Sequence, residues 1–212
     1  MSALRPPFEP LVGRLVTLQP LTREQLPELF EAIGRPEVFA GGWGGGPAGY
    51  RPDYVDWAAF MNDYLAWDTA LVYGVRLTGA DSSAPFAGRL VGTTTLGDLD
   101  LENESAHIGW TAYAPEVWGA GVNVETKLLL LGSAFDNGFG RVKLQADNLN
   151  ERSRAAILKL GATFEGVLRR MQRRADGTWR DTAVYSILAD EWPAVRAGLD
   201  ARLAAHQDSS RL

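Results

Sequence analysis

The segment that most restricts this chain joins a strand pattern to a helix pattern through a turn with two glycines. Residues 105–113 (SAHIGWTAY) alternate polar and apolar side chains, which predicts a half-buried strand. Residues 124–135 (VETKLLLLGSAF) contain a run of leucines and no proline, which predicts a helix, and Asn123 stands where its N-cap belongs. The connecting turn reads Trp118-Gly119-Ala120-Gly121-Val122-Asn123.

A turn of this kind is the local architecture of an anion site. The first turn of a helix leaves backbone N–H groups unpaired, and the helix dipole favours negative charge there. Glycines allow a phosphate group to approach the backbone closely. We therefore expect a phosphorylated ligand at residues 118–123, with an ordinary tight strand-to-helix connection as the alternative.

Composition limits the class of protein. The chain has 212 residues, which suits one domain, 1–212, and it contains no cysteine, which excludes disulfides and thiolate metal sites. No apolar run approaches the roughly 20 residues of a membrane span, and the N-terminus lacks the apolar stretch of a signal peptide, so we expect a cytoplasmic protein. The formal charge of −5 argues against a nucleic-acid partner. The one basic cluster, Arg169, Arg170, Arg173 and Arg174, is read as a solvated strand and turn, or as a rim around an anionic cofactor.

The order of elements predicts the fold class. Strands are predicted at 14–18, 70–77, 86–96, 105–113, 141–146, 164–171 and 179–188, and helices at 22–33, 53–67, 124–135, 151–160 and 191–205. Loops or turns are predicted at 41–49, 78–85 and 98–104. Antiparallel hairpins and strand–helix–strand crossovers both occur in this order. They predict an α/β (α+β) fold with a mixed central sheet of about seven strands and helices on both faces.

Three segments resemble the GCN5-related N-acetyltransferase (GNAT) superfamily and, more narrowly, its branch of ribosomal-protein alanine acetyltransferases (RimJ/RimL). They are residues 107–125, residues 148–162, and residues 164–169 together with 181–188. The resemblance implies an acceptor-side half at about 1–104, an acetyl-CoA-binding half at 105–188 and a C-terminal helix at 190–205. It also implies acetyl-CoA as cosubstrate and a homodimer.

In this family the glycine turn cradles the pyrophosphate of coenzyme A. The family's loop begins with Gln or Arg, where this chain has Trp118, and it ends with a small residue, where this chain has Asn123; Gly121 is kept. Trp118 supplies no cationic clamp, but backbone N–H groups can still bind the phosphates. The resemblance implies cofactor binding by Tyr113, Trp118, Gly119, Ala120, Gly121, Val122, Asn123, Asn150 and Ser153.

The family also parts two parallel strands to admit the pantetheine arm. Here these are 107–113 and 141–146, and a bulge near 111–114 is expected to leave a backbone N–H for the thioester carbonyl. Asn150 and Ser153 lie three residues apart, hence on one face of a helix. The resemblance places both against the cofactor arm, with the serine near the sulfur, while a plain N-cap is the alternative for Asn150.

The catalytic residues are predicted as His107, Ser153 and Asp181. Family members often carry Glu at the position of His107, and a histidine can accept a proton near neutral pH. A half-buried strand histidine without a chemical role is the alternative. A second acid of some relatives falls at Gln172, which cannot act as a base, so Asp181 and Glu165 remain candidates.

The acceptor is expected to bind to the N-terminal half. Trp43 and Tyr50, in and beside the glycine-rich loop, are the predicted substrate-binding residues, and Trp57 and Trp67 are predicted to belong to the core. No metal is implied, because the chain has two histidines and no cysteine.

The leading prediction is an acetyl-CoA-dependent N-acetyltransferase that transfers acetyl directly to a primary amine, either a protein N-terminus or a small molecule. One alternative keeps the reaction and changes the acyl donor, for example to succinyl-CoA, with Arg169 and Arg173 binding its carboxylate. Another is a catalytically weak module that senses CoA. A nucleotide-binding protein fits poorly, because no Lys-Ser or Lys-Thr opens the helix.

Overall fold

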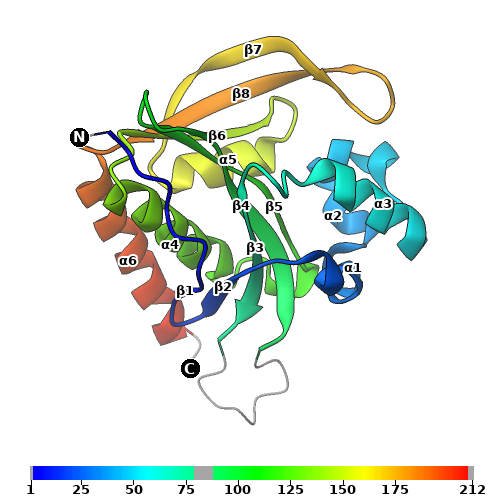
Figure 1. The fold of residues 1–212 in the computed structure, drawn as a ribbon, viewed down its shortest axis with the longest axis horizontal. Helices are drawn as coiled ribbons and strands as arrows, with labels where there is room; N and C mark the ends of the chain where they lie inside the picture. The colour runs from blue at the N-terminus through cyan, green and yellow to red at the C-terminus, as the bar shows by residue number, and fades with distance from the viewer. Residues whose placement is uncertain (1, 79–87, 210–212) are drawn as a thin grey trace.

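The structure is a computed structural model that describes residues 2–78 and 88–209. In these residues an eight-stranded mixed sheet has the order β1-β2-β3-β4-β5-β6-β8-β7 (Figure 1). The strands are β1 (Leu11–Val12), β2 (Val16–Pro20), β3 (Leu71–Leu77), β4 (Leu90–Asp100), β5 (Ser105–Tyr113), β6 (Arg141–Asp147), β7 (Thr163–Arg173) and β8 (Trp179–Leu188). The α-helices are α1 (Leu26–Ile33), α2 (Pro36–Ala40), α3 (Tyr54–Tyr64), α4 (Val122–Asp136), α5 (Glu151–Lys159) and α6 (Trp192–Ser209).

Helices cover both faces of the sheet, as predicted. Helix α1 packs against β4 and carries α3 on its outer side, whereas α4 contacts β2 and β6 and is backed by α6 (Figure 1). A buried apolar core joins the sheet to these helices and includes Leu18, Trp57, Leu131 and Tyr185. Among the described residues, no helix is both long and apolar enough to cross a membrane.

The sheet parts in its middle, as the resemblance implied. Strands β5 and β6 are parallel, and their pairing is limited to residues 105–107 of β5 opposite residues 141–143 of β6. Beyond His107 and Lys143 the two strands continue to Tyr113 and Asp147, respectively, without pairing with each other. The stretch over which β5 and β6 are not paired with each other is called the slot below.

A β-bulge lies beside this slot. Thr93 pairs with Ala112 and Thr95 pairs with Gly109, so two residues of β5, Trp110 and Thr111, oppose one residue of β4. Trp110 takes a φ of +51°, which is uncommon for a residue with a side chain. The bulge was predicted slightly further along the chain, at 111–114.

The N-terminus of α4 differs from the prediction. The helix begins at Val122, so its N-cap is Gly121, whose φ is +80°, and not Asn123, which lies in the first turn. A left-handed residue at the N-cap favours glycine, and this explains why the helix starts one residue after Gly121.

Several other helices and strands begin or end at residues different from those predicted. The eighth strand is the two-residue β1, and the predicted helix 22–33 is a 3₁₀ turn (Arg23–Gln25) followed by α1. Strand β4 extends to Asp100, into the predicted acidic turn, and α3 ends at Tyr64. The loop 41–49 contains two 3₁₀ turns, Trp43–Gly45 and Pro47–Gly49. The predicted turn 78–85 and the first residues of the strand 86–96 fall largely on 79–87, outside the described residues.

A buried carboxylate fixes α4 to the N-terminal strands. Glu125, with 3% of its surface exposed, accepts hydrogen bonds from the backbone N–H groups of Arg14, Leu15 and Val16 at 2.9, 2.6 and 2.7 Å (the last two to the same oxygen). These bonds hold the first turns of α4, and therefore the glycine turn, against the sheet.

Candidate active site

The glycine turn lies at the uncapped N-terminus of α4. Gly119 and Gly121 both have positive φ, at +83° and +80°. No side chain caps the helix at Gly121, and a Cβ placed on Gly119 would meet nothing within 4 Å. The turn is thus open at Gly119, whereas Gly121 at the helix end is buried next to Leu15 and His206. The first N–H groups of α4 and the positive end of a 15-residue dipole lie directly behind the open part of the turn.

Trp118 is held at the start of this turn. Its indole Nε1 donates to the carbonyl oxygen of Tyr113 at 3.0 Å, and the guanidinium carbon of Arg152 lies 3.9 Å from the centre of its ring. Arg152 belongs to the first turn of α5. A cation from α5 thus stands beside the turn, although the loop itself contains none.

Tyr113 and Asn123 connect the end of β5 to the first turn of α4. The Tyr113 hydroxyl donates to Asn123 Oδ1 at 3.2 Å. Burial raises the pKa of Tyr113 above its ordinary value, so the hydroxyl stays protonated and remains a donor. This bond gives both residues a structural partner at the predicted cofactor site.

A buried lysine lies beneath the bulge. Lys127, on α4, is 5% exposed, and its Nζ contacts Thr111 Oγ1 at 2.7 Å and Thr94 Oγ1 at 3.4 Å. No carboxylate of the described residues forms an ion pair with it. Burial lowers the pKa of Lys127 to about 7.

Asn150 has two partners. Its Oδ1 accepts from the Ser153 backbone N–H at 2.9 Å, which confirms the alternative role of N-cap of α5, and its Nδ2 donates to the carbonyl oxygen of Gly41. Asn150 therefore ties the glycine-rich loop of the N-terminal half to the start of α5. Ser153 is half-buried directly behind this cap.

His107 is the last β5 residue that pairs with β6, so it marks the point where the slot opens. It is 3% exposed, and its Nδ1 lies 3.1 Å from Asp98 Oδ2, an oxygen that also accepts from Lys143 Nζ at 3.1 Å. The Trp110 ring packs 5.2 Å from the imidazole. His107 Nε2 is buried and has no hydrogen-bond partner.

Burial and charge decide the protonation states of His107 and Asp98. Burial lowers the pKa of His107 below its ordinary value, against the opposing effect of Asp98. Hydrogen bonds from His107 and Lys143 hold the pKa of Asp98 far below its usual range. An ionised Asp98 accepts from Nδ1–H, so the neutral imidazole carries its lone pair on Nε2.

The other predicted acids have structural partners. Asp181 Oδ1 accepts from the Arg170 backbone N–H at 2.8 Å, where β7 bulges and Arg170 has a φ of +52°. Glu165 forms an ion pair with Arg141 and accepts from Ser186 Oγ at 2.7 Å. Neither contact involves His107.

The basic cluster is largely an outer face of the β7–β8 hairpin. Arg170 and Arg173 stack on Trp179, and Arg174 forms a bidentate ion pair with Asp147 at 2.6 and 2.8 Å. Arg169, Arg170 and Asp181 line a cavity of about 670 Å³.

Trp43 and Tyr50 lie in an aromatic cluster. Both pack edge-to-face against the buried ring of Phe39, at centroid distances of 5.2 and 5.6 Å, and Trp43 also packs against Tyr64. The two rings are partly buried beside the core. Trp57 is fully buried, as predicted.

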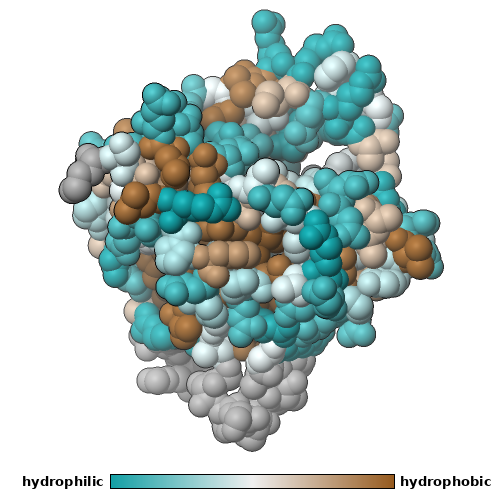
Figure 2. Space-filling model, viewed as in Figure 1, coloured by the Kyte–Doolittle hydropathy of each residue, from teal (hydrophilic) through white to brown (hydrophobic). Residues whose placement is uncertain are grey.

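The glycine-rich loop is held from both sides. Besides the bond from Asn150 to Gly41, the backbone N–H of Ala175, at the tip of the β7–β8 hairpin, donates to the Gly45 carbonyl at 3.3 Å. The hairpin thus arches from the sheet to the loop, and the surface is hollowed beneath it (Figure 2).

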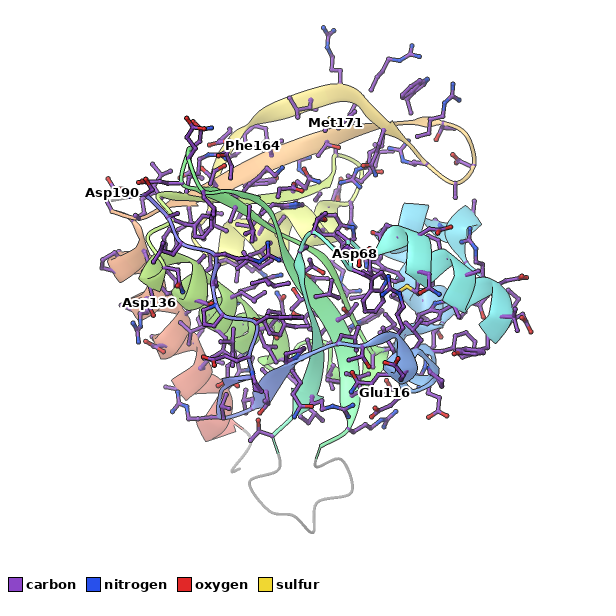
Figure 3. All side chains as sticks on the ribbon, in the orientation of Figure 1. Asp68, Glu116, Asp136, Phe164, Met171 and Asp190 are labelled. Atoms are coloured by element: carbon purple, nitrogen blue, oxygen red, sulfur yellow. The ribbon has the colours of Figure 1, made fainter. Side chains whose placement is uncertain are left out.

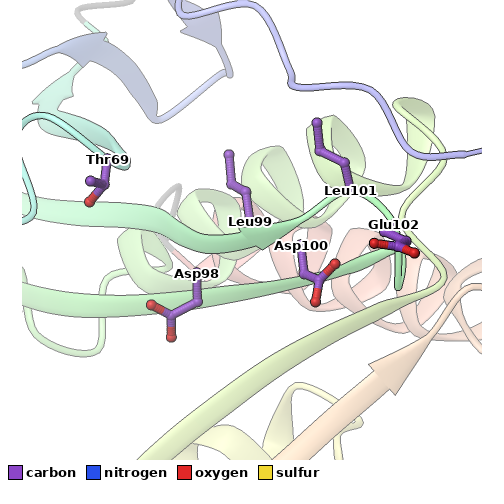
Figure 4. A pocket seen from close by; sticks show the side chains of 6 residues that line it. All are labelled: Thr69, Asp98, Leu99, Asp100, Leu101 and Glu102. Carbon is purple, nitrogen blue, oxygen red and sulfur yellow. The ribbon is translucent and has the colours of Figure 1, made fainter.

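A second hollow lies beside Asp98. It has a volume of about 590 Å³ and is lined by Thr69 and by the end of β4 with the turn that follows, where Asp98, Asp100 and Glu102 point to one side (Figure 4). Among the described residues, no group of three or more histidines or carboxylates could hold a metal ion.

Three residues at this site were missed from the sequence. Asp98 was read as part of a turn, Lys127 as one position of an apolar helix, and Arg152 as an ordinary helix residue. The β4–β5 pairing, once known, would have brought Asp98 next to His107. The residues next to Lys127 and Arg152 in the sequence do not indicate their contacts, because these contacts come from packing between distant segments.

Comparison with known proteins agrees with this geometry. Residues 15–163 match the family described as the acetyltransferase (GNAT) domain. YdaF of Bacillus subtilis, provisionally named a ribosomal N-acetyltransferase, is 32% identical over 117 residues, which cover 55% of this chain and 63% of YdaF. The match therefore spans less than two thirds of that relative.

Solved structures share the fold. A GCN5-related N-acetyltransferase from Brucella melitensis superposes with a TM-score of 0.83 at 26% identity, over 95% of this chain and 88% of that one. RimJ of Mycobacterium smegmatis, solved with CoA-disulfide, has a TM-score of 0.69 at 22% identity, over 92% and 91% of the two chains. The chain belongs to the GNAT acetyltransferase family, as its sequence predicted, and it has named relatives in the RimJ/RimL-like branch.

Proposed function

We propose that the chain is an N-acetyltransferase that takes acetyl from acetyl-CoA and transfers it to a primary amine. The observation that carries this proposal is the neutral His107, whose Nε2 is buried without a partner at the point where β5 and β6 part. A protonated amine must lose a proton before its nitrogen can attack the thioester, and an unpaired imidazole nitrogen can accept that proton.

Asp98 orients this base. Because its carboxylate accepts from Nδ1–H, the lone pair of His107 stays on Nε2, and the imidazolium formed by proton uptake remains next to a negative charge. Trp110 packs against the ring and restricts its rotation. His107 therefore acts as the general base, with Asp98 as a positioning residue.

The residues around the slot fit coenzyme A. The uncapped helix end at Gly121 and the open space at Gly119 suit its diphosphate, and the unpaired edges of β5 and β6 suit the amides of the pantetheine arm. When bound, acetyl-CoA supplies the activated acetyl group. RimJ of Mycobacterium smegmatis, which shares the fold, was solved with CoA-disulfide, and this supports the assignment.

The bulge and Ser153 complete the proposed chemistry. A backbone N–H released from the β4–β5 ladder at Trp110–Thr111 can donate to the thioester oxygen as charge develops there. The Ser153 hydroxyl, in the first turn of α5, is proposed to donate a hydrogen bond to the departing thiolate, which takes up its proton from solvent. Asp181 already holds the β7 bulge, so a catalytic role for it rests on the sequence prediction alone.

The acceptor is proposed to enter beneath the β7–β8 hairpin. The arch touches the glycine-rich loop at Ala175 and Gly45, next to the cluster that contains Trp43 and Tyr50. The carboxylates beside Asp98 favour a cationic acceptor, as an ammonium group is. Both a protein N-terminus and a small amine satisfy this condition.

The test is a transfer assay with acetyl-CoA and a panel of small amines and peptide N-termini, with succinyl-CoA in parallel. We expect free thiol to appear with acetyl-CoA and an amine together. In H107Q the rate should fall by about 100-fold, as is typical for loss of a general base, while the Kd for CoA stays unchanged. A higher rate with succinyl-CoA would change the acyl donor, and CoA binding without turnover on any amine would favour a sensor.

A further inference from the structure

The cation beside the glycine turn comes from another element. Arg152 is exposed in the first turn of α5, and its guanidinium carbon lies 3.9 Å from the ring centre of Trp118. Among the described residues it forms no ion pair with a carboxylate. Its charge is therefore not neutralised within this part of the protein.

Trp118 holds this arginine in place. The indole is fixed by its bond to the Tyr113 carbonyl and presents a flat face to the guanidinium. A guanidinium stacked on an aromatic ring still directs its N–H groups outward in its own plane. Stacking thus orders the side chain without using its hydrogen-bond donors.

The turn next to Trp118 has donors but no cation. Gly119 and Gly121 have positive φ, and the α4 N-terminus is uncapped. None of residues 118–123 carries a positive charge. A ligand with two negative phosphates would meet backbone N–H groups there, and a fixed cation nearby would add a charge-assisted bond.

We propose that Arg152, held over Trp118, is the cationic clamp for the diphosphate of coenzyme A in this chain. The inference rests on the proposed function, because it needs CoA to bind at the turn. The proposal also gives Trp118 a function. At the position where the family's loop has Gln or Arg, this chain has an aromatic ring on which an arginine from α5 stacks.

The experiment measures the Kd of CoA by isothermal titration for the wild type, R152A, R152K, W118F and W118A. R5A is the matched control, because Arg5 is exposed in the N-terminal segment and its loss changes the net charge equally. We expect a Kd about 10-fold higher in R152A and W118A, about 3-fold higher in R152K, and near the wild-type value in W118F and R5A. The dependence of log Kd on log salt should become shallower in R152A.

A second ligand identifies the phosphate that is bound. With 3′-dephospho-CoA, R152A should show the same fold-loss as with CoA, because the diphosphate is kept. If the loss disappears with dephospho-CoA, the assignment to the diphosphate is overturned. Equal Kd values in wild type and R152A, or an equal loss in R5A, would overturn the clamp while leaving CoA binding intact. A wild type that binds no CoA would refute the proposed function and the clamp together.

Discussion

Replacing the buried Lys127 by methionine should stabilise the protein at neutral pH. The lysine ammonium lies among the sheet residues Thr94 and Thr111 without a described carboxylate partner, and burial lowers its pKa from 10.5 to about 7. Methionine is unbranched and of similar length, so it can fill the same space. The two threonine hydroxyls keep each other as partners at 2.8 Å, and the change therefore leaves no isolated polar group.

The magnitude follows from the two pKa values. The unfolded chain binds the Lys127 proton below about pH 10.5, whereas the folded chain binds it only below about pH 7. Stability therefore falls as the pH drops between these values, at about 1.4 kcal/mol per pH unit, and then stays level. The lysine costs roughly 4 kcal/mol at pH 7 and roughly 2 kcal/mol at pH 9. Its lost hydrogen bonds offset about 2 kcal/mol of the gain.

Urea unfolding at two pH values separates these contributions. K127M should be more stable than the wild type by about 2 kcal/mol near pH 7 and about equal to it near pH 9. K159M is the matched control, because Lys159 is exposed on α5, and its unfolding free energy should follow the wild type at both pH values. The informative quantity is the change of about 2 kcal/mol between the two conditions, which does not depend on how well methionine packs.

Parallel stability curves for wild type and K127M would refute the reasoning. They would mean that Lys127 titrates in the fold as it does in the unfolded chain, so that water or an anion reaches it. A K127M protein that loses stability at both pH values would show instead that the contacts with Thr94 and Thr111 outweigh the cost of burying the charge.

Three further predictions concern other parts of the molecule. E125A should lower the unfolding free energy by about 3 kcal/mol, because three backbone N–H groups, one buried and two partly buried, lose their acceptor. The exposed E151A should change it by less than about 0.5 kcal/mol, and equal urea midpoints for the two variants would contradict this. D98N removes the carboxylate that raises the pKa of His107. The acid limb of the kcat/KM profile should therefore move to lower pH, and the maximal rate should fall. An acid limb at the wild-type pH would show that Asp98 does not act on His107. Strand β7 lies at an edge of the sheet and exposes apolar side chains, including Phe164 and Met171 (Figure 3). Light scattering should therefore find a homodimer that the M171E substitution dissociates, and a monomeric wild type would refute this prediction.

Local signals in the sequence were sufficient for the framework of the site. Alternation in 105–113 and the leucine run of 124–135 predicted β5 and α4, and the position of Asn150 directly before a helix made an N-cap one of its two predicted roles. These features depend on residues within one turn or one strand. The splayed pair of strands came from the resemblance to a family, since no local pattern encodes it.

The remaining features depend on contacts between distant segments. Asn123 was wrong as the N-cap because a left-handed glycine can begin a helix as effectively as a polar side chain. Asp98 becomes a partner of His107 only through the register of β4 and β5. Lys127 is one position of an apolar helix in the sequence, and only the packing of α4 under the bulge shows that its charged side chain is buried.

The way the glycine-rich loop is fastened bears on how such a protein can change its substrate during evolution. Both fastenings, from Asn150 and from Ala175, end on main-chain oxygens, those of Gly41 and Gly45. A main-chain oxygen is present whatever side chain the residue carries. Substitutions at Trp43 or Tyr50 can therefore reshape the lining of the loop while its attachment to α5 and to the β7–β8 hairpin persists. Under the proposed function, acceptor choice could then drift independently of the chemistry.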